Sequence, residues 1–394
     1  METYLLLKIG VMFAVLAAVG VIASKMKQSV IPFYLLAGIS VGPYGLGRTS
    51  IPHIPNTEFI QISAELGIVF LLFFLGLEFN LDRLIEGRKK IGKAGILDFG
   101  VNFGAGFFLG FWLFGGLLEA VLIAGIVYMS SSAIITKSLI DLGWIANDEA
   151  EPMLGTLIFE DVFIAIYLAI MSSLLFKGGG WREAVGSMGI ALGFLLSLLI
   201  LVHFGTKYFE KMVETDSNEF MILRLVGTAV LIGGAGLALG VSEAVAGFFV
   251  GMAFSSTSYV EDIEKLMEPF RDVFAAVFFF WIGLVTDPLL FLGTGSVILL
   301  LVLLTTPTKL VSGFLSGKVY ALSRIRSLRV GVGMTTRGEF SLIIASLALM
   351  VSGVSISERG AQNVYASTVG YVLVMSILGT TLMEHSSKFE KYLE

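Results

Sequence analysis

The chain is a succession of long apolar runs separated by short polar segments. About 20 apolar residues are enough for an α-helix to cross the hydrocarbon core of a bilayer. Thirteen apolar runs fit one span each, although the ninth is short and rich in glycine. They lie near residues 3–24, 30–47, 60–80, 91–114, 117–140, 153–176, 184–204, 219–239, 242–255, 270–286, 289–316, 328–351 and 364–383. The pattern predicts an all-α polytopic membrane protein with 13 transmembrane helices.

Composition supports this prediction and removes several functional classes. The chain is 56% hydrophobic and 14% charged, whereas soluble domains have about 45–50% apolar and about 25% charged residues. It has no cysteine, so disulfide frameworks and thiolate sites are excluded, and its three histidines have no zinc-ligand spacing. A net charge of −5 argues against nucleic-acid binding. The first run is long for a signal peptide and is expected to remain as a span. No cofactor is expected.

The distribution of Lys and Arg predicts the orientation. Of 26 basic residues, 17 fall in predicted loops on one face and 4 on the other. Basic loops face the cytoplasm. The predicted location is therefore the plasma membrane, with an external amino terminus and a cytoplasmic carboxyl terminus.

Two short motifs recur at nearly one offset. "AGISVG" (37–42) returns as "AGFFVG" (246–251), and "FFLGL" (73–77) returns as "FWIGL" (280–284). The offsets of 209 and 207 place spans two to six on spans nine to thirteen. Because the copies start seven spans apart, the second is inserted upside down. Inverted five-helix repeats are typical of secondary transporters, whose sites lie near the midplane between the repeats.

The sixth span carries two adjacent acids, Glu160 and Asp161. Asp161 lies ~12 Å below the cytoplasmic end of the span at 1.5 Å per residue, where an ionised acid costs ~2.5–3.5 kcal/mol. Neighbouring helical residues point about 100° apart, so the two acids occupy different environments. Lys309, equally deep in the eleventh span, is the expected ion-pair partner of Glu160. Asp161 is then left to bind a proton or, transiently, Na⁺ or K⁺. The alternative is a static Glu160–Lys309 pair with no part in transport.

The fifth and twelfth spans each contain a polar break. Unpaired backbone at membrane depth survives only where protein or a wet cavity satisfies it. Two discontinuous helices are therefore expected to cross beside the sixth span. The alternative is intact helices whose hydroxyls bond to the preceding turn. The expected supporting residues are Ser131, Ser132, Thr136, Thr336, Arg337 and Glu339.

Other embedded polar residues are less informative. Five charged residues near span ends are expected in interfacial positions: Glu65, Glu78, Asp98, Arg224 and Glu243. Asn102 occupies the repeat position equivalent to Lys309, so it is a candidate for hydrogen bonding near the crossing.

Six segments together resemble the monovalent cation:proton antiporter-2 family. They are "IPFYLLAGISVGPYGLG", "LGIVFLLFFLGLEFNLDRL", "SSSAIITKSL", the acid pair, "PFRDVFAAVFFFWIGLVTD" and "RGEFSLIIA". The resemblance implies a homodimer in which a core domain moves like an elevator and exposes Asp161 to alternate faces. The implied parts are a dimerisation domain (1–90 and 219–288), a core domain (91–176 and 289–383), a linker helix (177–218) and a cytoplasmic tail (384–394).

Two departures from the family pattern affect the expectation. The residue before the transport aspartate is usually Asn, Gln or Asp, and here it is Glu160. An acid there, opposite Lys309, resembles the electrogenic sodium/proton exchangers, whereas an amide resembles electroneutral or potassium-selective members. The sequence also ends at Glu394, whereas potassium-efflux members often continue into a nucleotide-binding regulatory domain. That domain is absent, truncated or supplied by a separate cytoplasmic subunit.

The expected function is exchange of protons for Na⁺ or K⁺. A cation channel would conduct without proton coupling, and a sodium-coupled symporter would not require Lys309. An intramembrane aspartyl protease needs acids on two facing helices, whereas Glu160 and Asp161 share one helix. The protein is therefore not expected to be an enzyme.

Overall fold

The computed structural model consists of α-helices in the part of the chain that it describes. The described residues are 5–26, 28–49, 53–78, 81–144, 146–175, 207–215, 217–239, 243–255, 257–350, 352–353 and 355–386, with isolated positions between 193 and 200. The helices of the first half are α1 (Leu5–Lys25), α2 (Ile31–Val41), α3 (Glu58–Glu78), α4 (Leu81–Phe114), α5 (Leu117–Tyr128), α6 (Ser132–Asp141) and α7 (Ala150–Leu175). Those of the second half are α9 (Asn218–Ala238), α10 (Glu243–Ser255), α11 (Val260–Leu284), α12 (Leu290–Val319), α13 (Arg324–Gly333), α14 (Glu339–Met350) and α15 (Glu358–Glu384).

Every predicted span except the seventh coincides with one helix or with a broken pair of helices. The seventh span and most of the linker helix lie outside the described ranges. Six of the described helices are long and apolar enough to cross a membrane unaided. Two span boundaries were wrong, because α4 and α11 each begin ten residues before the predicted span. Both extensions are charged, so hydropathy assigned them to loops, although the helices continue beyond the apolar part.

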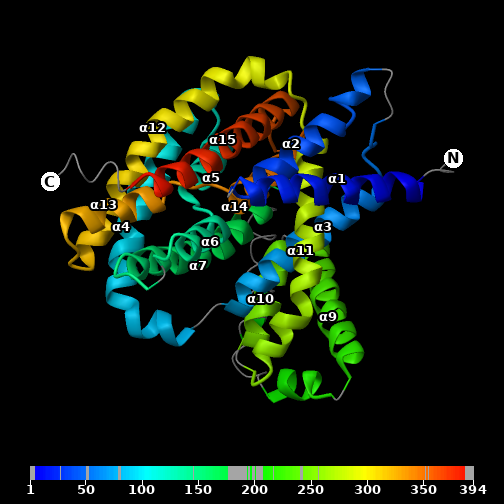
Figure 1. Cartoon of the computed structure of the whole chain (residues 1–394), viewed down its shortest axis with the longest axis horizontal. Helices are drawn as coiled ribbons and strands as arrows, with labels where there is room; N and C mark the ends of the chain where they lie inside the picture. The colour runs from blue at the N-terminus through cyan, green and yellow to red at the C-terminus, as the bar shows by residue number, and fades with distance from the viewer. Residues whose placement is uncertain are drawn as a thin grey trace.

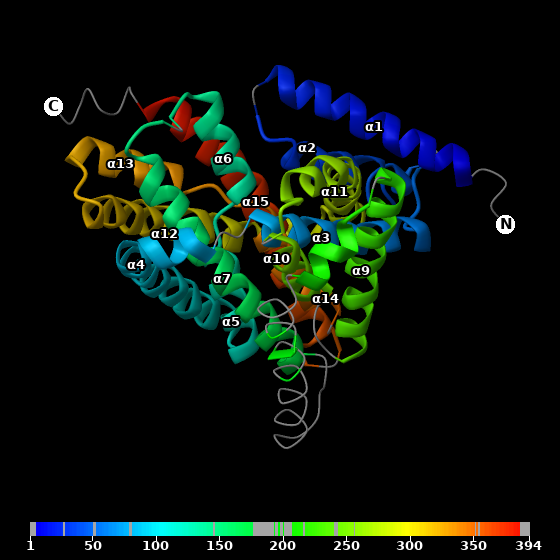
Figure 2. The same cartoon turned by 90° about the horizontal axis from the view of Figure 1, so that it is seen from below.

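The helices form two bundles (Figures 1 and 2). The first bundle contains α1, α2, α3, α9, α10 and α11, and the second contains α4 to α7 and α12 to α15. α1 lies at one end of the molecule, in the first bundle, and α13 lies at the opposite end, in the second (Figure 1). Each bundle therefore combines helices from both halves of the sequence, as an interleaved repeat requires.

The motifs that revealed the repeat lie where helices of the two repeats touch. Gly38 of α2 packs on the backbone of Phe280 in α11, and Gly283 of α11 packs on the backbone of Leu35. In the equivalent pair, α3 packs against α10 with a glycine facing backbone from each side, at positions 76 and 251. A Cβ at these positions would overlap the facing carbonyl oxygen. The glycines are therefore needed for close approach, a common device in membrane helices.

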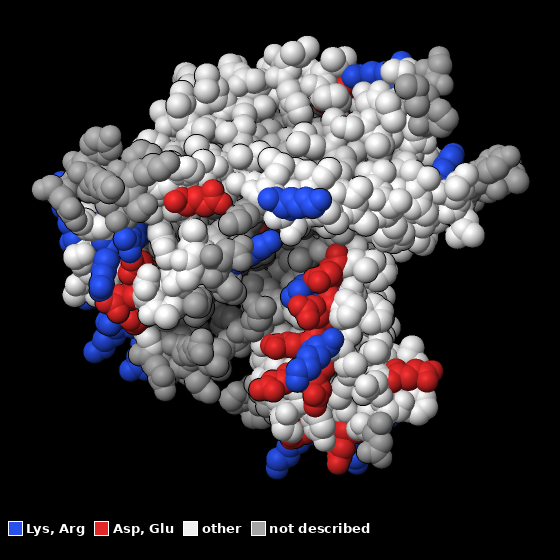
Figure 3. All heavy atoms as spheres, in the orientation of Figure 1, with Lys and Arg blue, Asp and Glu red and all other residues white. Residues whose placement is uncertain are grey.

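The surface is largely apolar, as a membrane protein requires. Leu6, Phe108, Trp112 and Leu292 are all at least 70% exposed. Charged side chains collect near the end of the molecule that holds α13 and over the lobe that holds α10 and α11 (Figure 3). The charged start of α11 lines a surface pocket of about 450 Å³. The exposed apolar side chains and the six membrane-capable helices of the described ranges show an integral membrane protein.

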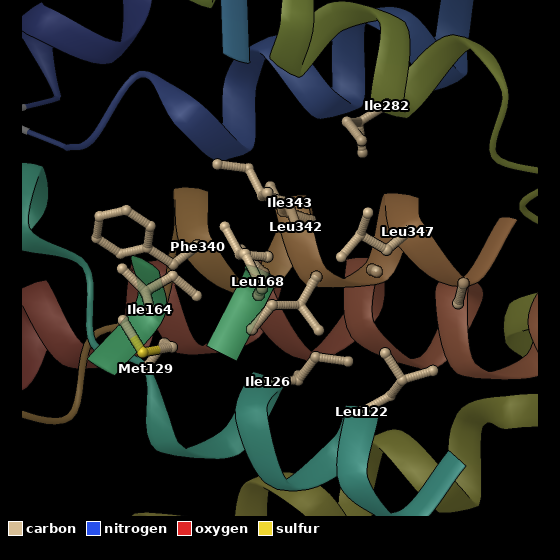
Figure 4. Packing of buried hydrophobic residues seen from close by; sticks show 14 of the residues in the cluster. Leu122, Ile126, Met129, Ile164, Leu168, Ile282, Phe340, Leu342, Ile343 and Leu347 are labelled. Atoms are coloured by element: carbon tan, nitrogen blue, oxygen red, sulfur yellow. The ribbon is translucent and has the colours of Figure 1, made fainter. Parts of the chain in front are cut away.

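The two bundles meet through an apolar core. Leu342, Ile343 and Leu347 of α14 lie between side chains of α5 and α7 on one side and Ile282 of α11 on the other (Figure 4). The hydroxyl of Tyr365 in α15 donates a 2.7 Å hydrogen bond to the carbonyl oxygen of Ile282. This bond adds a polar contact to a boundary that is otherwise packed with apolar side chains.

Candidate functional site

Two helices of the second bundle are interrupted at the same place. The first break separates α5 from α6 between Tyr128 and Ser132, and the second separates α13 from α14 between Gly333 and Glu339. The backbone amide of Ser131 donates to the carbonyl oxygen of Thr336 at 3.2 Å. This bond joins the two breaks, so the predicted pair of discontinuous helices is confirmed and the intact-helix alternative is wrong.

Side chains satisfy the backbone that the breaks expose. The hydroxyl of Ser131 donates to Glu339 Oε2 at 2.6 Å. Arg337 is fully buried and donates from Nη1 to the carbonyl oxygens of residues 334, 335 and 336. A cation at the carboxyl end of α13 complements the negative end of the helix dipole. Thr336 is fully buried and packs against Gly379 of α15. Ser131, Thr336, Arg337 and Glu339 therefore hold the crossing together.

Glu160 projects from α7 into this crossing and is fully buried. Its Oε2 accepts a 2.6 Å bond from the backbone amide of Ser130, and its Oε1 accepts a 3.0 Å bond from the Ser130 hydroxyl. Lys309 of α12 donates to the same Oε1 at 2.7 Å. The predicted Glu160–Lys309 ion pair is therefore present, and it joins α7, α12 and the break before α6.

Lys309 has a second acidic partner that the sequence did not suggest. Its Nζ lies 2.6 Å from Asp98 Oδ2, and both side chains are fully buried. Nζ also lies 5.2 Å from the centre of the Tyr128 ring. The interfacial assignment of Asp98 was therefore wrong. Because α4 begins at Leu81, residue 98 lies in the middle of that helix rather than near its start.

Asp98 is enclosed by hydrogen-bond donors. Its Oδ1 accepts from the Ser312 hydroxyl at 2.6 Å and from Asn102 Nδ2 at 2.9 Å. Asn102 Nδ2 also lies 2.8 Å from the Ser312 hydroxyl, and its Oδ1 accepts from Thr308 at 2.9 Å. Asn102 thus fixes the orientation of the carboxylate that binds Lys309. Its position in the repeat, equivalent to that of Lys309, predicted hydrogen bonding in this region.

Asp161 occupies a different environment from Glu160, as helical geometry predicted. Its side chain is half-buried, and Ser132 Oγ lies 3.4 Å from Asp161 Oδ1. Ser132 is the first residue of α6, so the carboxylate lies close to the positive end of a half-helix. Thr136 lies one turn further along α6 and is also half-buried. The arrangement offers one accessible carboxylate beside one sequestered charge network.

The other charged positions lie in the first bundle and are apart from this network. Glu243 is buried, and its Oε2 has no hydrogen-bond partner within the described residues, so its interfacial assignment was wrong. It begins α10, a helix that packs against both α3 and α9. Glu65 is half-buried and Arg224 is exposed, as expected for span edges. The side chain of Glu78 lies outside the described residues.

Comparison with known proteins identifies relatives along the whole chain. The sequence profile described as "Sodium/hydrogen exchanger, transmembrane" matches residues 11–384. The K⁺/H⁺ antiporter subunit KhtU of Bacillus subtilis is 34% identical across 99% of this chain and 95% of its own length. The ammonium/H⁺ antiporter subunit AmhT of Alkalihalophilus pseudofirmus is 30% identical across 95% and 91%. The solved sodium/proton antiporter MjNhaP1 of Methanocaldococcus jannaschii superposes with a TM-score of 0.73 at 18% identity, covering 98% of this chain and 99% of its own. The last match shows that the fold is shared.

Proposed function

Because the chain belongs to the sodium/hydrogen exchanger family, we propose that its proton-coupled antiport of a monovalent cation is carried by Asp161. The observation that supports this role is the contrast within the acid pair. Glu160 is fully buried and bonded to Lys309, whereas Asp161 is half-buried beside the first residue of α6. A carboxylate must be reachable to trade one ligand for another, and Asp161 is the more accessible of the two.

Coupling follows if a proton and a cation occupy the same carboxylate in turn. A protonated Asp161 has no charge to hold a cation, and a cation-bound Asp161 has no free charge to hold a proton. The Ser132 hydroxyl and the amino end of α6 would support the ionised form and help to complete the coordination of a dehydrated cation. The carrier could not then cross the membrane while empty without a free-energy cost, because the ionised carboxylate would be exposed to a low dielectric without a counter-charge.

We propose K⁺ as the first cation to test. The support is the match to a relative named as a K⁺/H⁺ antiporter subunit along almost its whole length. A second relative is named for ammonium, an ion of similar size to K⁺. Glu160 and Lys309 alone resembled the sodium exchangers, so Na⁺ belongs in the same experiment.

We propose that the second bundle moves against the first, which forms the interface of a homodimer. The support is that both breaks, the acid pair and Lys309 all lie in the second bundle. The proposed orientation places the amino terminus outside the plasma membrane and the carboxyl terminus in the cytoplasm. Because two relatives are named as antiporter subunits, a separate cytoplasmic regulatory subunit is a proposed partner.

The test is proton movement in proteoliposomes that carry an imposed pH gradient. Adding K⁺, Na⁺ or NH₄⁺ should evoke proton movement with wild type and with Asp262→Asn, a control that removes an exposed acid from α11. Asp161→Asn should show none. Cation flux without proton movement would indicate a channel, and solute uptake driven by Na⁺ would indicate a symporter. Equal exchange by wild type and Asp161→Asn would overturn the assignment of Asp161.

A further inference from the structure

We propose that Asp98 sets the charge stoichiometry of the exchange by keeping Lys309 protonated throughout the transport cycle. The inference rests on the proposed function, because it concerns the lysine beside the proposed carrier Asp161. It assigns to Asp98 a positioning role, exerted through Lys309. The consequence is electroneutral exchange of one proton for one cation.

The first argument is the number of anions around Lys309. Its Nζ lies 2.6 Å from Asp98 on α4 and 2.7 Å from Glu160 on α7. The aromatic face of Tyr128 on α5 covers a third side at 5.2 Å, a contact that favours a cation. Asp161 adjoins Glu160 in the chain and adds a further negative charge when it is ionised. Each of these acids and the ring therefore favours the ammonium form of Lys309.

The second argument is that both carboxylates are arranged as anions. Asp98 is contacted by three donors: Lys309, Ser312 and Asn102. The amide nitrogen of Asn102 faces Asp98, because it also donates at 3.0 Å to the backbone carbonyl oxygen of that residue, which can only accept. Glu160 is likewise contacted by donors only: Lys309 and the amide and hydroxyl of residue 130. Hydrogen bonds donated to a carboxylate favour its ionised form.

The third argument is the consequence of removing the proton from Lys309. With one acidic partner, the lysine could pass its proton to that partner and leave a neutral pair. With two, the neutral amine would leave at least one buried carboxylate beside it without a counter-charge, a strongly unfavourable arrangement. Lys309 therefore keeps its proton while Asp161 alone releases and binds one. Each cation is exchanged for one proton, and no net charge crosses the membrane.

This conclusion differs from what Glu160 and Lys309 suggest when taken alone. That pair resembles the electrogenic exchangers, in which a lysine proton can be added to the cycle. The additional partner is Asp98, which lies 211 residues from Lys309 in the chain and contacts it only after α4 packs against α12. The tertiary contact thus reverses the expected stoichiometry.

The experiment measures the ion gradient at which coupled proton movement stops in proteoliposomes, with and without an imposed membrane potential. For wild type, movement should stop when the cation ratio across the membrane equals the proton ratio, and the potential should not change that point. A net charge moved in each cycle would make the point depend on the potential. Asp98→Asn removes one anion from Lys309 and should make exchange potential-dependent, whereas Asp98→Glu should keep it independent.

The possible outcomes separate the two proposals. Potential-dependent exchange by wild type would overturn the inference and leave the proposed function intact, and this result needs no variant to fold. Potential-independent exchange by both wild type and Asp98→Asn would overturn the role of Asp98. Complete absence of cation-evoked proton movement in wild type would overturn the proposed function and the inference with it.

Discussion

Glu160 and Asp161 are adjacent in the chain, yet Glu160 is fully buried against Lys309 while Asp161 is half-buried beside Ser132. Within one turn of α7, Glu160 therefore faces an ion-pair network and Asp161 faces a more accessible position. The same separation distinguishes substitutions that should change stability from those that should change transport.

The hydroxyls on either side of the first break should have different roles. Ser132→Ala removes a hydroxyl that lies 3.4 Å from Asp161 Oδ1. It should raise the half-saturating cation concentration by about tenfold, since one hydrogen bond to a charged group contributes about 1.5 kcal/mol. Ser130→Ala removes a bond to Glu160 and should mainly lower the melting temperature. Cation-dependent proton movement and thermal unfolding of both variants provide the test. A larger affinity loss in Ser130→Ala would contradict the assignment.

Removing Lys309 should destabilise the protein more than removing the charge of Glu160. Lys309→Met leaves two buried acids without their common cation, at a cost of about 3–5 kcal/mol. Glu160→Gln leaves Lys309 paired with Asp98 and should cost about 1–3 kcal/mol. The measurement is the melting temperature of the two purified variants in detergent. The reverse order would indicate that Asp98 and Glu160 are not both ionised.

The hydrogen bond from Tyr365 to Ile282 joins the two bundles and should affect turnover if the bundles move. Tyr365→Phe removes the bond to the Ile282 carbonyl, worth about 1 kcal/mol, which is a roughly fivefold change in an equilibrium. The maximal exchange rate should change by up to that factor. Tyr371→Phe is the matched control, because its hydroxyl bonds to Thr305 within the second bundle. Equal effects of the two variants on turnover would argue against movement at this boundary.

Close packing of the two repeats predicts that glycine is required at position 283. Gly283→Ala would place a methyl group against the Leu35 backbone and should cost about 1–3 kcal/mol. Gly293→Ala on α12 has nothing near its added carbon and should stabilise that helix by about 0.5–1 kcal/mol. Melting temperatures of the two variants should therefore shift in opposite directions. A stable Gly283→Ala variant would mean that α2 and α11 can separate without loss.

Competition at Asp161 predicts a specific pH dependence of transport. As pH falls, more of the carrier is protonated, so the half-saturating cation concentration should rise, approaching about tenfold for each pH unit. The maximal rate at saturating cation should change little over the same range. Initial rates over a matrix of cation concentrations and pH values test this directly. A half-saturating concentration that is independent of pH would exclude a shared carboxylate.

Local sequence predicted some residues of the candidate site and missed others. Lys309 was identified because a cation at mid-membrane needs an anion, and the acid pair of the sixth span lies at the same depth. Asp98 was missed because its depth depends on where α4 begins. Six of the first ten residues of α4 are charged, so hydropathy placed the span boundary too near Asp98. Glu243 was missed for a similar reason, because its burial comes from α3 and α9 rather than from its own helix.

The sequence by itself determined the membrane environment, the inverted repeat, the two broken helices and the acid pair. Each of these is visible in local patterns: the length of apolar runs, recurring glycine motifs and charged residues within predicted spans, where ionised groups are energetically unfavourable. Only the tertiary structure decided which acids surround Lys309, because that depends on the packing of α4, α7 and α12. Whether a buried lysine has one counter-ion or two is a property of three-dimensional distance, and a separation of 211 positions in the chain leaves no local signal of it.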